Sequence, residues 1–188
     1  MIKKTRAFIC GISGHNLKKS EVSFLKKYKP WGIILFSRNI KSINQVQKLT
    51  GSIKKIFKNS NYPILIDEEG GRVSRLRKFI DNSIFSAKYF GDLYSKDRKK
   101  FDIYFNVYVK QISYLLRLIG ININTVPVLD LRRNKSHKII GDRSYSNDKK
   151  TLSKIGDISI EKFHENRVGT VIKHCLLYTS PSPRDSRR

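Results

Sequence analysis

The sequence has few cysteines and no long apolar run. Only two cysteines, Cys10 and Cys175, occur in 188 residues, too few and too far apart for the disulfide framework of a small secreted domain. No stretch approaches the roughly 20 apolar residues that cross a membrane. The apolar run at residues 7–10 is too short for the core of a signal peptide and lacks a small-residue cleavage site. We therefore expect a cytoplasmic protein with no membrane partner.

Acidic residues are also scarce, since 15 Asp and Glu stand against 39 Lys and Arg, which gives a formal charge of +24. Such a field attracts polyanions, so a basic nucleic-acid-binding module is the alternative hypothesis. The lysines occur as scattered pairs such as Lys54-Lys55 and Lys99-Lys100, a pattern typical of solvated helix faces. No nucleic-acid-binding motif is present. The abundance of Ile, Asn, Lys, Tyr and Phe is the bias that AT-rich coding DNA produces, and we expect no nucleic acid partner.

The order of apolar segments predicts an α/β fold with one core. Short apolar runs alternate with amphipathic segments, which is typical of a parallel sheet built from strand-then-helix units. The expected strands lie at residues 6–12, 32–36, 64–66, 123–129 and 169–173. The expected helices lie at residues 21–28, 43–57, 96–119 and 149–166.

Capping residues set the bounds of these helices. Ser20, Ser42 and Asp148 stand where N-caps belong, and Gln45 would complete a capping box with Ser42. Gly120 stands where the chain must turn after a long helix. The helix before it is the clearest in the sequence, because apolar and aromatic residues recur at alternating steps of four and three, namely Phe101, Phe105, Tyr108, Ile112, Leu115 and Ile119.

Charged side chains follow three of the expected strands. Asp67 follows the third strand, Asp130 the fourth, and Lys173-His174 the fifth. Active sites of eight-stranded barrels are built at that end of the strands, so these positions favour part of a TIM (β/α)8 barrel, truncated after about five strands. An open doubly wound sheet obeys a similar rule and stays open as an alternative.

The segment at residues 67–75 reads Asp-Glu-Glu-Gly-Gly-Arg-Val-Ser-Arg. Its glycines allow a tight turn, and it brings carboxylates and guanidinium groups together. Carboxylates accept paired hydrogen bonds from vicinal hydroxyls and arginine donates in a planar fork, so the combination suits sugar recognition. A purely structural ion-pair turn explains the same spacing equally well.

Five motifs in order resemble those of bacterial NagZ-type β-N-acetylglucosaminidases of glycoside hydrolase family 3. They are residues 34–39, 67–75, 126–130 and 140–146, followed by Lys173-His174. The segment at residues 67–75 is the most specific of them, although Glu68 stands where relatives usually carry glutamine. An added charge there could raise the pKa of neighbouring groups or weaken the site.

The resemblance implies a glycosidase that removes terminal non-reducing N-acetylglucosamine from peptidoglycan fragments in cell-wall recycling. It implies a retaining mechanism, a muropeptide substrate, a monomer, and no metal or cofactor. The positions that would hold the sugar are Asp67, Arg75, Arg143, Lys173 and His174. Without the resemblance, Arg143 could merely pair with Asp142 in a turn, and His174 could be a satisfied buried histidine. Asp130 and Arg72 are expected to support loops.

The resemblance ends after His174. The family continues there with Phe-Pro-Gly-His-Gly and a histidine acid/base, whereas residues 175–188 form a Ser-Pro-rich, arginine-ended tail that resembles out-of-frame sequence. We therefore divide the chain into residues 1–174, the N-terminal part of the barrel, and residues 175–188, a tail that does not look native. No catalytic residue of the family is matched, so an inactive fragment with an unclosed barrel is expected. A sugar-binding protein without catalysis is a third possibility.

Overall fold

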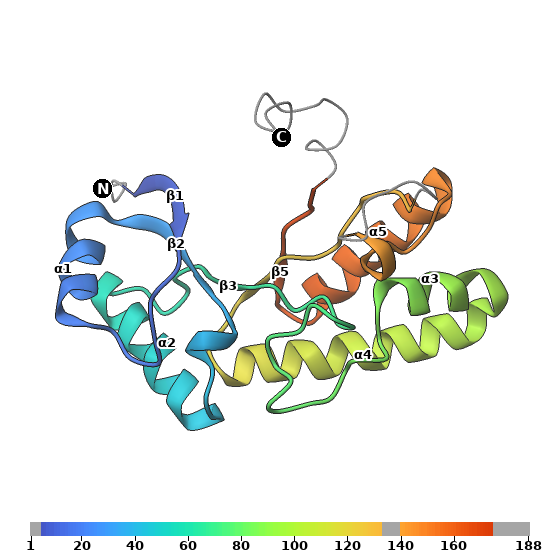
Figure 1. The fold of residues 1–188 in the computed structure, drawn as a ribbon. Coiled ribbons are helices and arrows are strands. Elements are labelled where there is room, and N and C mark those ends of the chain that lie inside the picture. The colour runs from blue at the N-terminus through green and yellow to red at the C-terminus, as the bar shows by residue number, and fades with distance from the viewer. Residues whose placement is uncertain (1–4, 133–139, 175–188) are drawn as a thin grey trace, which may run out of the picture.

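A computed structural model describes residues 5–132 and 140–174, which form one α/β unit (Figure 1). Five parallel strands make a single sheet in the order β1-β2-β3-β4-β5. The strands are β1 (Arg6–Cys10), β2 (Pro30–Leu35), β3 (Ile64–Ile66), β4 (Ile123–Asn124) and β5 (Gly169–Thr170). The helices are α1 (Lys19–Tyr28), α2 (Ile43–Phe57), α3 (Ala87–Lys96), α4 (Arg98–Leu118) and α5 (Lys149–Glu165), with short 3-10 turns η1 (Ser37–Asn39) and η2 (Gly141–Arg143).

The strand order decides between the two expected architectures. Each strand pairs with the next one along the chain, and helices connect them. An open doubly wound sheet reverses its strand order at a switch point, whereas a (β/α)8 barrel adds strands in sequence. The expected partial barrel is therefore confirmed, and the open sheet was the wrong alternative.

Most predicted elements are present with shifted ends. The helix over residues 43–57 begins as expected, because the Ser42 hydroxyl accepts from the Gln45 amide at 3.3 Å. The Gln45 side chain accepts instead from the Lys41 amide, so the capping box is only half formed. Asp148 caps α5 as expected, by accepting from the Thr151 amide at 2.8 Å.

The prediction of Ser20 as N-cap was wrong, because α1 begins two residues earlier than expected, at Lys19. The Glu21 carboxylate provides the missing acceptors, since it takes the main-chain N–H groups of Ser13 and Lys18 at 2.8 Å each. A carboxylate in the first turn satisfies free amides as a cap hydroxyl does, and it also interacts favourably with the helix dipole. Ser20 is therefore an ordinary exposed residue of the first turn.

Helix α3 was not predicted, because no helix is expected from the sequence between residues 67 and 95. The Ser86 hydroxyl accepts from the Tyr89 amide and begins the helix. Phe90, on its buried face, packs edge-on against Phe101 and Phe105 of α4 with ring centroids 6.5 Å and 4.9 Å apart. Tertiary packing of this kind stabilises a helix too short to be stable alone.

Strands β4 and β5 are shorter than predicted, and asparagine side chains in and beside β4 take over part of its pairing with the β3 segment. Asn124 is fully buried, and its amide both accepts from the Glu68 N–H at 3.0 Å and donates to the Glu68 carbonyl at 2.8 Å. Asn122 accepts from the Ile64 N–H at 2.8 Å. Pro127 has no N–H to donate, so β4 cannot continue as a regular ladder.

The long helix α4 ends close to its predicted position and is anchored to α2. Gly120 has a φ of +79°, the left-handed conformation that glycine adopts without strain. The Thr50 hydroxyl of α2 donates to the Ile119 carbonyl at 2.9 Å. No helix of residues 5–132 and 140–174 has the length and apolar content needed to cross a membrane. The predicted tail, residues 175–188, lies outside the described residues.

Candidate functional site

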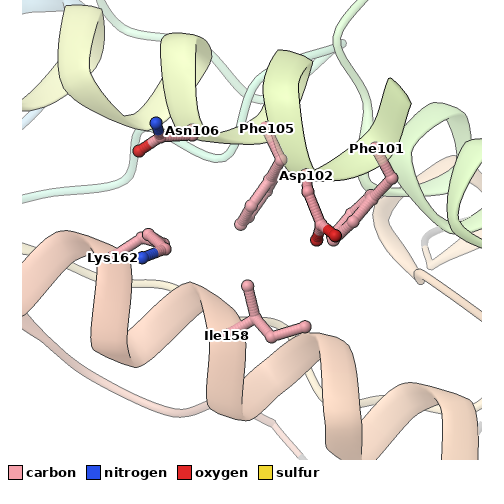
Figure 2. Close-up of a pocket in the computed structure, with 6 residues that line it drawn as sticks. All are labelled: Phe101, Asp102, Phe105, Asn106, Ile158 and Lys162. Carbon is pink, nitrogen blue, oxygen red and sulfur yellow. The ribbon is translucent and has the colours of Figure 1, made fainter. Parts of the chain in front are cut away.

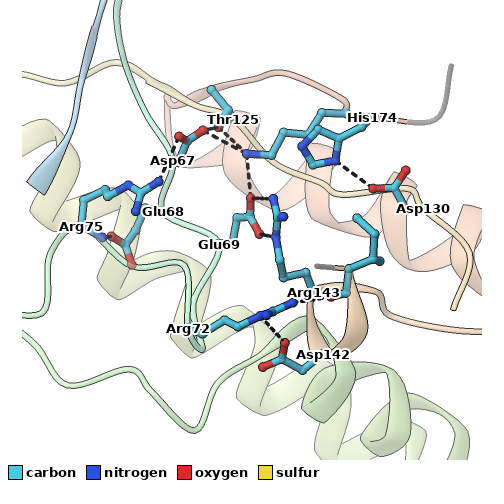
Figure 3. A network of polar contacts seen from close by, with 12 residues as sticks. Asp67, Glu68, Glu69, Arg72, Arg75, Thr125, Asp130, Asp142, Arg143 and His174 are labelled. Atoms are coloured by element: carbon cyan, nitrogen blue, oxygen red, sulfur yellow. Dashed lines mark hydrogen bonds and ion pairs between the residues drawn. The ribbon is translucent and has the colours of Figure 1, made fainter. Parts of the chain in front are cut away.

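The ends of β3, β4 and β5 present their polar side chains to one another (Figure 3). Ile66 of β3 is in register with Asn124 of β4, so Asp67 and Thr125 follow side by side. Val128 bridges to Lys173 beyond β5, which brings that lysine to the same edge. The carboxyl ends of neighbouring parallel strands thus converge, as the sequence predicted.

Asp67 lies in the centre of this network. Its Oδ1 atom is 3.0 Å from the Lys173 ammonium and accepts from the Thr125 hydroxyl, and its Oδ2 atom is 3.3 Å from the Arg75 guanidinium. Burial alone would raise the pKa of Asp67, but these three donors together hold the pKa below its ordinary value. Asp67 is therefore a carboxylate that is kept ionised and oriented.

Glu69 links two of the predicted sugar-binding cations. Its carboxylate takes a bidentate pair from Arg143, with both contacts at 2.8 Å, and its Oε1 lies 2.7 Å from the Lys173 ammonium. The Glu69 side chain is only 5% exposed. Burial opposes its ionisation, yet Arg143 and Lys173 hold the pKa of Glu69 below its ordinary value. Such a planar, two-contact pair fixes the direction of a guanidinium group.

The alternative pairing of Arg143 with Asp142 is wrong. Asp142 pairs instead with Arg72, whose Nε lies 2.7 Å from its Oδ1, and Arg72 also donates to the Ile140 carbonyl at 3.1 Å. This exposed pair connects the loop after β3 to η2. Arg72 therefore supports the loop, as predicted, and Arg143 is turned to Glu69.

The His174 ring is held by Asp130, on the side of the site away from Arg75 in Figure 3. The ring Nδ1 lies 2.8 Å from Oδ2 of Asp130, a residue only 6% exposed. The structure thus brings all five predicted residues to one strand edge. It adds Glu69, Thr125 and Asp130, which the sequence had not placed in the site.

The charges within this network balance. Three carboxylates, Asp67, Glu69 and Asp130, face three cations, Arg75, Arg143 and Lys173. The excess positive charge of the chain therefore lies elsewhere on its surface. A balanced array of oriented donors and acceptors suits an uncharged ligand with many hydroxyl groups better than a polyanion.

Glu68 is turned away from this network and is almost fully buried, with 1% of its surface exposed. Its carboxylate accepts from the main-chain amides of Arg75 and Leu76 at 2.7 Å and 2.9 Å, and from the Asn82 amide at 2.6 Å. Burial raises the pKa of Glu68 despite these hydrogen bonds. Burial and, after it, the charge of Glu68 raise the pKa of the neighbouring Tyr108 hydroxyl, as expected. The pKa values of Asp67 and Glu69 are nevertheless lowered by their own hydrogen-bonding and cationic partners.

We expect Glu68→Gln to stabilise the protein at pH 7 by about 1 kcal/mol, because a neutral amide avoids the cost of burying a charge that the hydrogen bonds only partly offset. Glutamine keeps an acceptor for the two main-chain amides, and the Asn82 amide can rotate to accept from its new N–H. A carboxyl with a raised folded-state pKa binds protons more tightly when folded, so its unfavourable contribution grows as pH rises through that pKa. The stability gain should therefore shrink between pH 7 and pH 4.

Urea denaturation at several pH values measures this effect. Glu161→Gln on the exposed side of α5 is the matched control and should change the unfolding free energy by less than about 0.5 kcal/mol at every pH. A Glu68→Gln protein that is less stable than the parent at pH 7 would show that the ionised carboxylate stabilises the loop.

A separate crevice of about 330 Å³ lies between α4 and α5 (Figure 2). Its lining residues are Phe101, Asp102, Phe105, Asn106, Ile158 and Lys162. Asp102 is the acidic residue in this lining, and its Oδ1 atom lies 2.9 Å from Nε of Arg98 in the same helix. The crevice therefore brings no polar network comparable to the strand-end site. Among residues 5–132 and 140–174, no three His, Cys, Asp or Glu side chains gather to hold a metal ion.

Comparison with known families identifies the family to which this fold belongs. The profile of the glycosyl hydrolase family 3 N terminal domain matches residues 4–181. The chain belongs to glycosyl hydrolase family 3. Within that family it is related to the bacterial β-hexosaminidases, and it is 28% identical over 166 residues to the β-hexosaminidase of Xanthomonas campestris, a match that covers 88% of this chain and 49% of that protein.

Solved structures of the family give the same relationship. Native NagZ from Neisseria gonorrhoeae superposes with a TM-score of 0.79 at 25% identity, over 90% of this chain and 49% of that chain. The same enzyme in complex with N-trifluoroacetyl-D-glucosamine superposes with a TM-score of 0.77 at 25% identity, over 90% of this chain and 50% of that chain. The chain thus spans about half the length of these relatives.

Proposed function

We propose that this family 3 chain is the sugar-binding part of a cytoplasmic β-N-acetylhexosaminidase. The substrate would be a peptidoglycan fragment with a terminal non-reducing N-acetylglucosamine, cleaved with a retaining mechanism. The observation that carries the proposal is the convergence of Asp67, Arg75, Arg143, Lys173 and His174 at one strand edge. A relative of the same fold is complexed with an N-acylated glucosamine, which supports the choice of sugar.

In this proposal each side chain has a defined part in holding the sugar. Asp67 accepts from hydroxyls, because its ionised carboxylate is fixed by three donors. Arg143 and Lys173 donate to sugar oxygens and are held in place by Glu69. Uncharged sugars are bound through many such oriented hydrogen bonds, so the charge balance of the site fits this ligand.

We further propose that residues 1–174 form the N-terminal part of a closed barrel. The outer strands β1 and β5 each have only one partner among the described strands. Apolar side chains near them are exposed, with Ile9 at 44%, Val171 at 38% and Ile172 at 54%. Further strands of a barrel would cover these edges, which otherwise favour aggregation.

We expect the 188-residue chain to bind a nitrophenyl β-N-acetylglucosaminide without releasing nitrophenol. A retaining glycosidase needs a nucleophile and an acid/base on either side of the bond, and residues 1–174 match neither position of the family. Equilibrium dialysis followed by absorbance measures both binding and release. Asp67→Ala should lose the binding, whereas Asp81→Ala, at an exposed loop position, should keep it. If the 188-residue chain releases nitrophenol and Asp67→Ala abolishes that release, the proposal that residues outside this chain carry out catalysis is wrong.

A basic nucleic-acid-binding module is the competing proposal, and it makes a different prediction. Binding through phosphate contacts weakens steeply with salt. A filter-binding titration at two salt concentrations therefore separates the two functions. Tight, salt-sensitive binding of an oligonucleotide without any binding of the glycoside would favour the nucleic-acid module.

A further inference from the structure

In the hydrogen bond between Asp130 and His174, the donor and the acceptor can be assigned. The imidazole Nδ1 lies 2.8 Å from Oδ2 of Asp130, whose side chain is 6% exposed, while the His174 side chain is 26% exposed. An ionised carboxylate has no proton to donate, so the proton of this hydrogen bond belongs to Nδ1. In the neutral ring the other nitrogen, Nε2, then has a free lone pair.

The Asp130 carboxylate is not needed to support its own loop. The hydroxyl of Ser144, from the segment after η2, donates to the main-chain carbonyl of Asp130 at 2.5 Å. The Arg132 amide donates to the Ser146 carbonyl at 3.1 Å, so main-chain groups connect the two segments. Within residues 5–132 and 140–174, the hydrogen-bonding partner of the carboxylate is His174. The earlier expectation that Asp130 serves the loop therefore describes its main chain and not its side chain.

The other side chains of the site are mostly hydrogen-bond donors, so the tautomer of His174 determines whether the site has a further acceptor. Arg75, Arg143 and Lys173 can only donate hydrogen bonds. A sugar hydroxyl that donates therefore needs an acceptor, and Asp67 already accepts from three groups. An imidazole with its lone pair on Nε2 adds a second acceptor to a site rich in donors.

We propose that Asp130 is a positioning residue that fixes His174 with its proton on Nδ1, so that Nε2 accepts a hydrogen bond from a sugar hydroxyl. The part that concerns the sugar rests on the proposed function, whereas the tautomer is a property of the protein alone. Asp130 itself does not touch the ligand in this arrangement. It acts by setting which His174 nitrogen carries the proton.

The tautomer is tested by long-range ¹H–¹⁵N correlation spectra of the full 188-residue chain at about pH 8, where histidine side chains are neutral. The four histidines are distinguished by the signal that disappears in His174→Gln. We expect a protonated Nδ1 on His174. Asp130→Leu removes the acceptor, and Asp130→Asn offers an amide N–H that can donate to Nδ1, so both should move the proton to Nε2. Asp130→Glu keeps an acceptor-only carboxylate and should retain the proton on Nδ1. A loss of packing alone does not produce this difference between Asn and Glu.

A protonated Nε2 on His174 in the parent protein would overturn the proposal, and so would an unchanged tautomer in a folded Asp130→Leu protein. If Asp130→Leu does not fold, the parent and Asp130→Asn spectra still decide the role of Asp130, because Asn has nearly the same shape and should move the proton to Nε2. The sugar part is tested by titration with N-acetylglucosamine, whose affinity should fall about five- to tenfold in Asp130→Leu and Asp130→Asn and be kept in Asp130→Glu. Failure of the parent to bind the sugar would contradict the proposed function and leave the tautomer result intact.

Discussion

Replacing Gly91 with alanine is expected to destabilise the protein by about 3 kcal/mol or more, the upper range for overpacking a closed interface. Gly91 lies on the buried face of α3, and an added Cβ would stand 1.7 Å from the Tyr145 carbonyl oxygen and 2.6 Å from its carbon. These are main-chain atoms, so no rotamer change relieves the overlap. The segment after η2 must move away from α3, and Arg143 would move with it.

Gly51→Ala is the matched control for this change. Gly51 also lies in a helix, but it is exposed and nothing lies within 4 Å of an added Cβ. Alanine should stabilise α2 by about 0.5–1 kcal/mol because it is the better helix former. Urea denaturation of both variants gives the comparison. Equal stability of the two would show that α3 does not pack against the segment at residues 141–146 as described.

Replacing Glu69 with glutamine should cost about 3–5 kcal/mol, the range for removing one partner of a buried ion pair. Arg143 and Lys173 are each 14% exposed at the side chain, so water cannot fully replace the lost carboxylate. Asp67 still pairs with Lys173, which leaves Arg143 the more severely unbalanced cation. The unfolding free energy at pH 7 measures this cost.

The exposed pair of Asp92 and Lys88 provides the control. Both side chains are about half exposed, and surface pairs of this kind contribute 0 to about 1 kcal/mol. Asp92→Asn should therefore change stability by well under 1 kcal/mol. A Glu69→Gln effect no larger than that of Asp92→Asn would mean that the strand-end network is solvated and not buried.

The pH dependence of Glu69→Gln follows from the direction of the pKa shift. A carboxyl with a lowered folded-state pKa contributes stability above its unfolded pKa, about 4, and this stability is lost as pH falls through the folded value. Asp67 and Glu69 both have lowered values. The difference between Glu69→Gln and the parent should thus be largest near neutral pH and diminish below about pH 4.

The residues at the strand ends could be predicted, because a short segment of sequence is enough to locate each strand end. A buried run such as Ile64–Ile66 that ends in a carboxylate places that carboxylate at the edge of a parallel sheet. Asp67, Lys173 and His174 follow from this rule. Arg75 and Arg143 lie on connecting segments, so they were predicted from the family resemblance alone.

The sequence could not predict which charged groups pair, because pairing depends on the register and on loops of different strands. Glu69 meets Arg143 from a position 74 residues away, and spacing alone offered Asp142 as a nearer partner. Thr125 could have been found from the register, since it follows β4 as Asp67 follows β3. Helix α3 was missed because its short sequence, with Gly91 in its middle, is stabilised by packing on α4 and not by intrinsic preference.

The central claim is that this chain holds N-acetylglucosamine at the ends of β3, β4 and β5, and residue-resolved NMR titration tests it most directly. Addition of N-acetylglucosamine to the 188-residue chain should shift backbone amide signals at residues 67–75, 141–143 and 173–174, and glucose should shift them less. Asp67→Asn should abolish the shifts while the spectrum stays folded. A dispersed spectrum in which these amides do not respond, or respond equally in Asp67→Asn, would contradict the account.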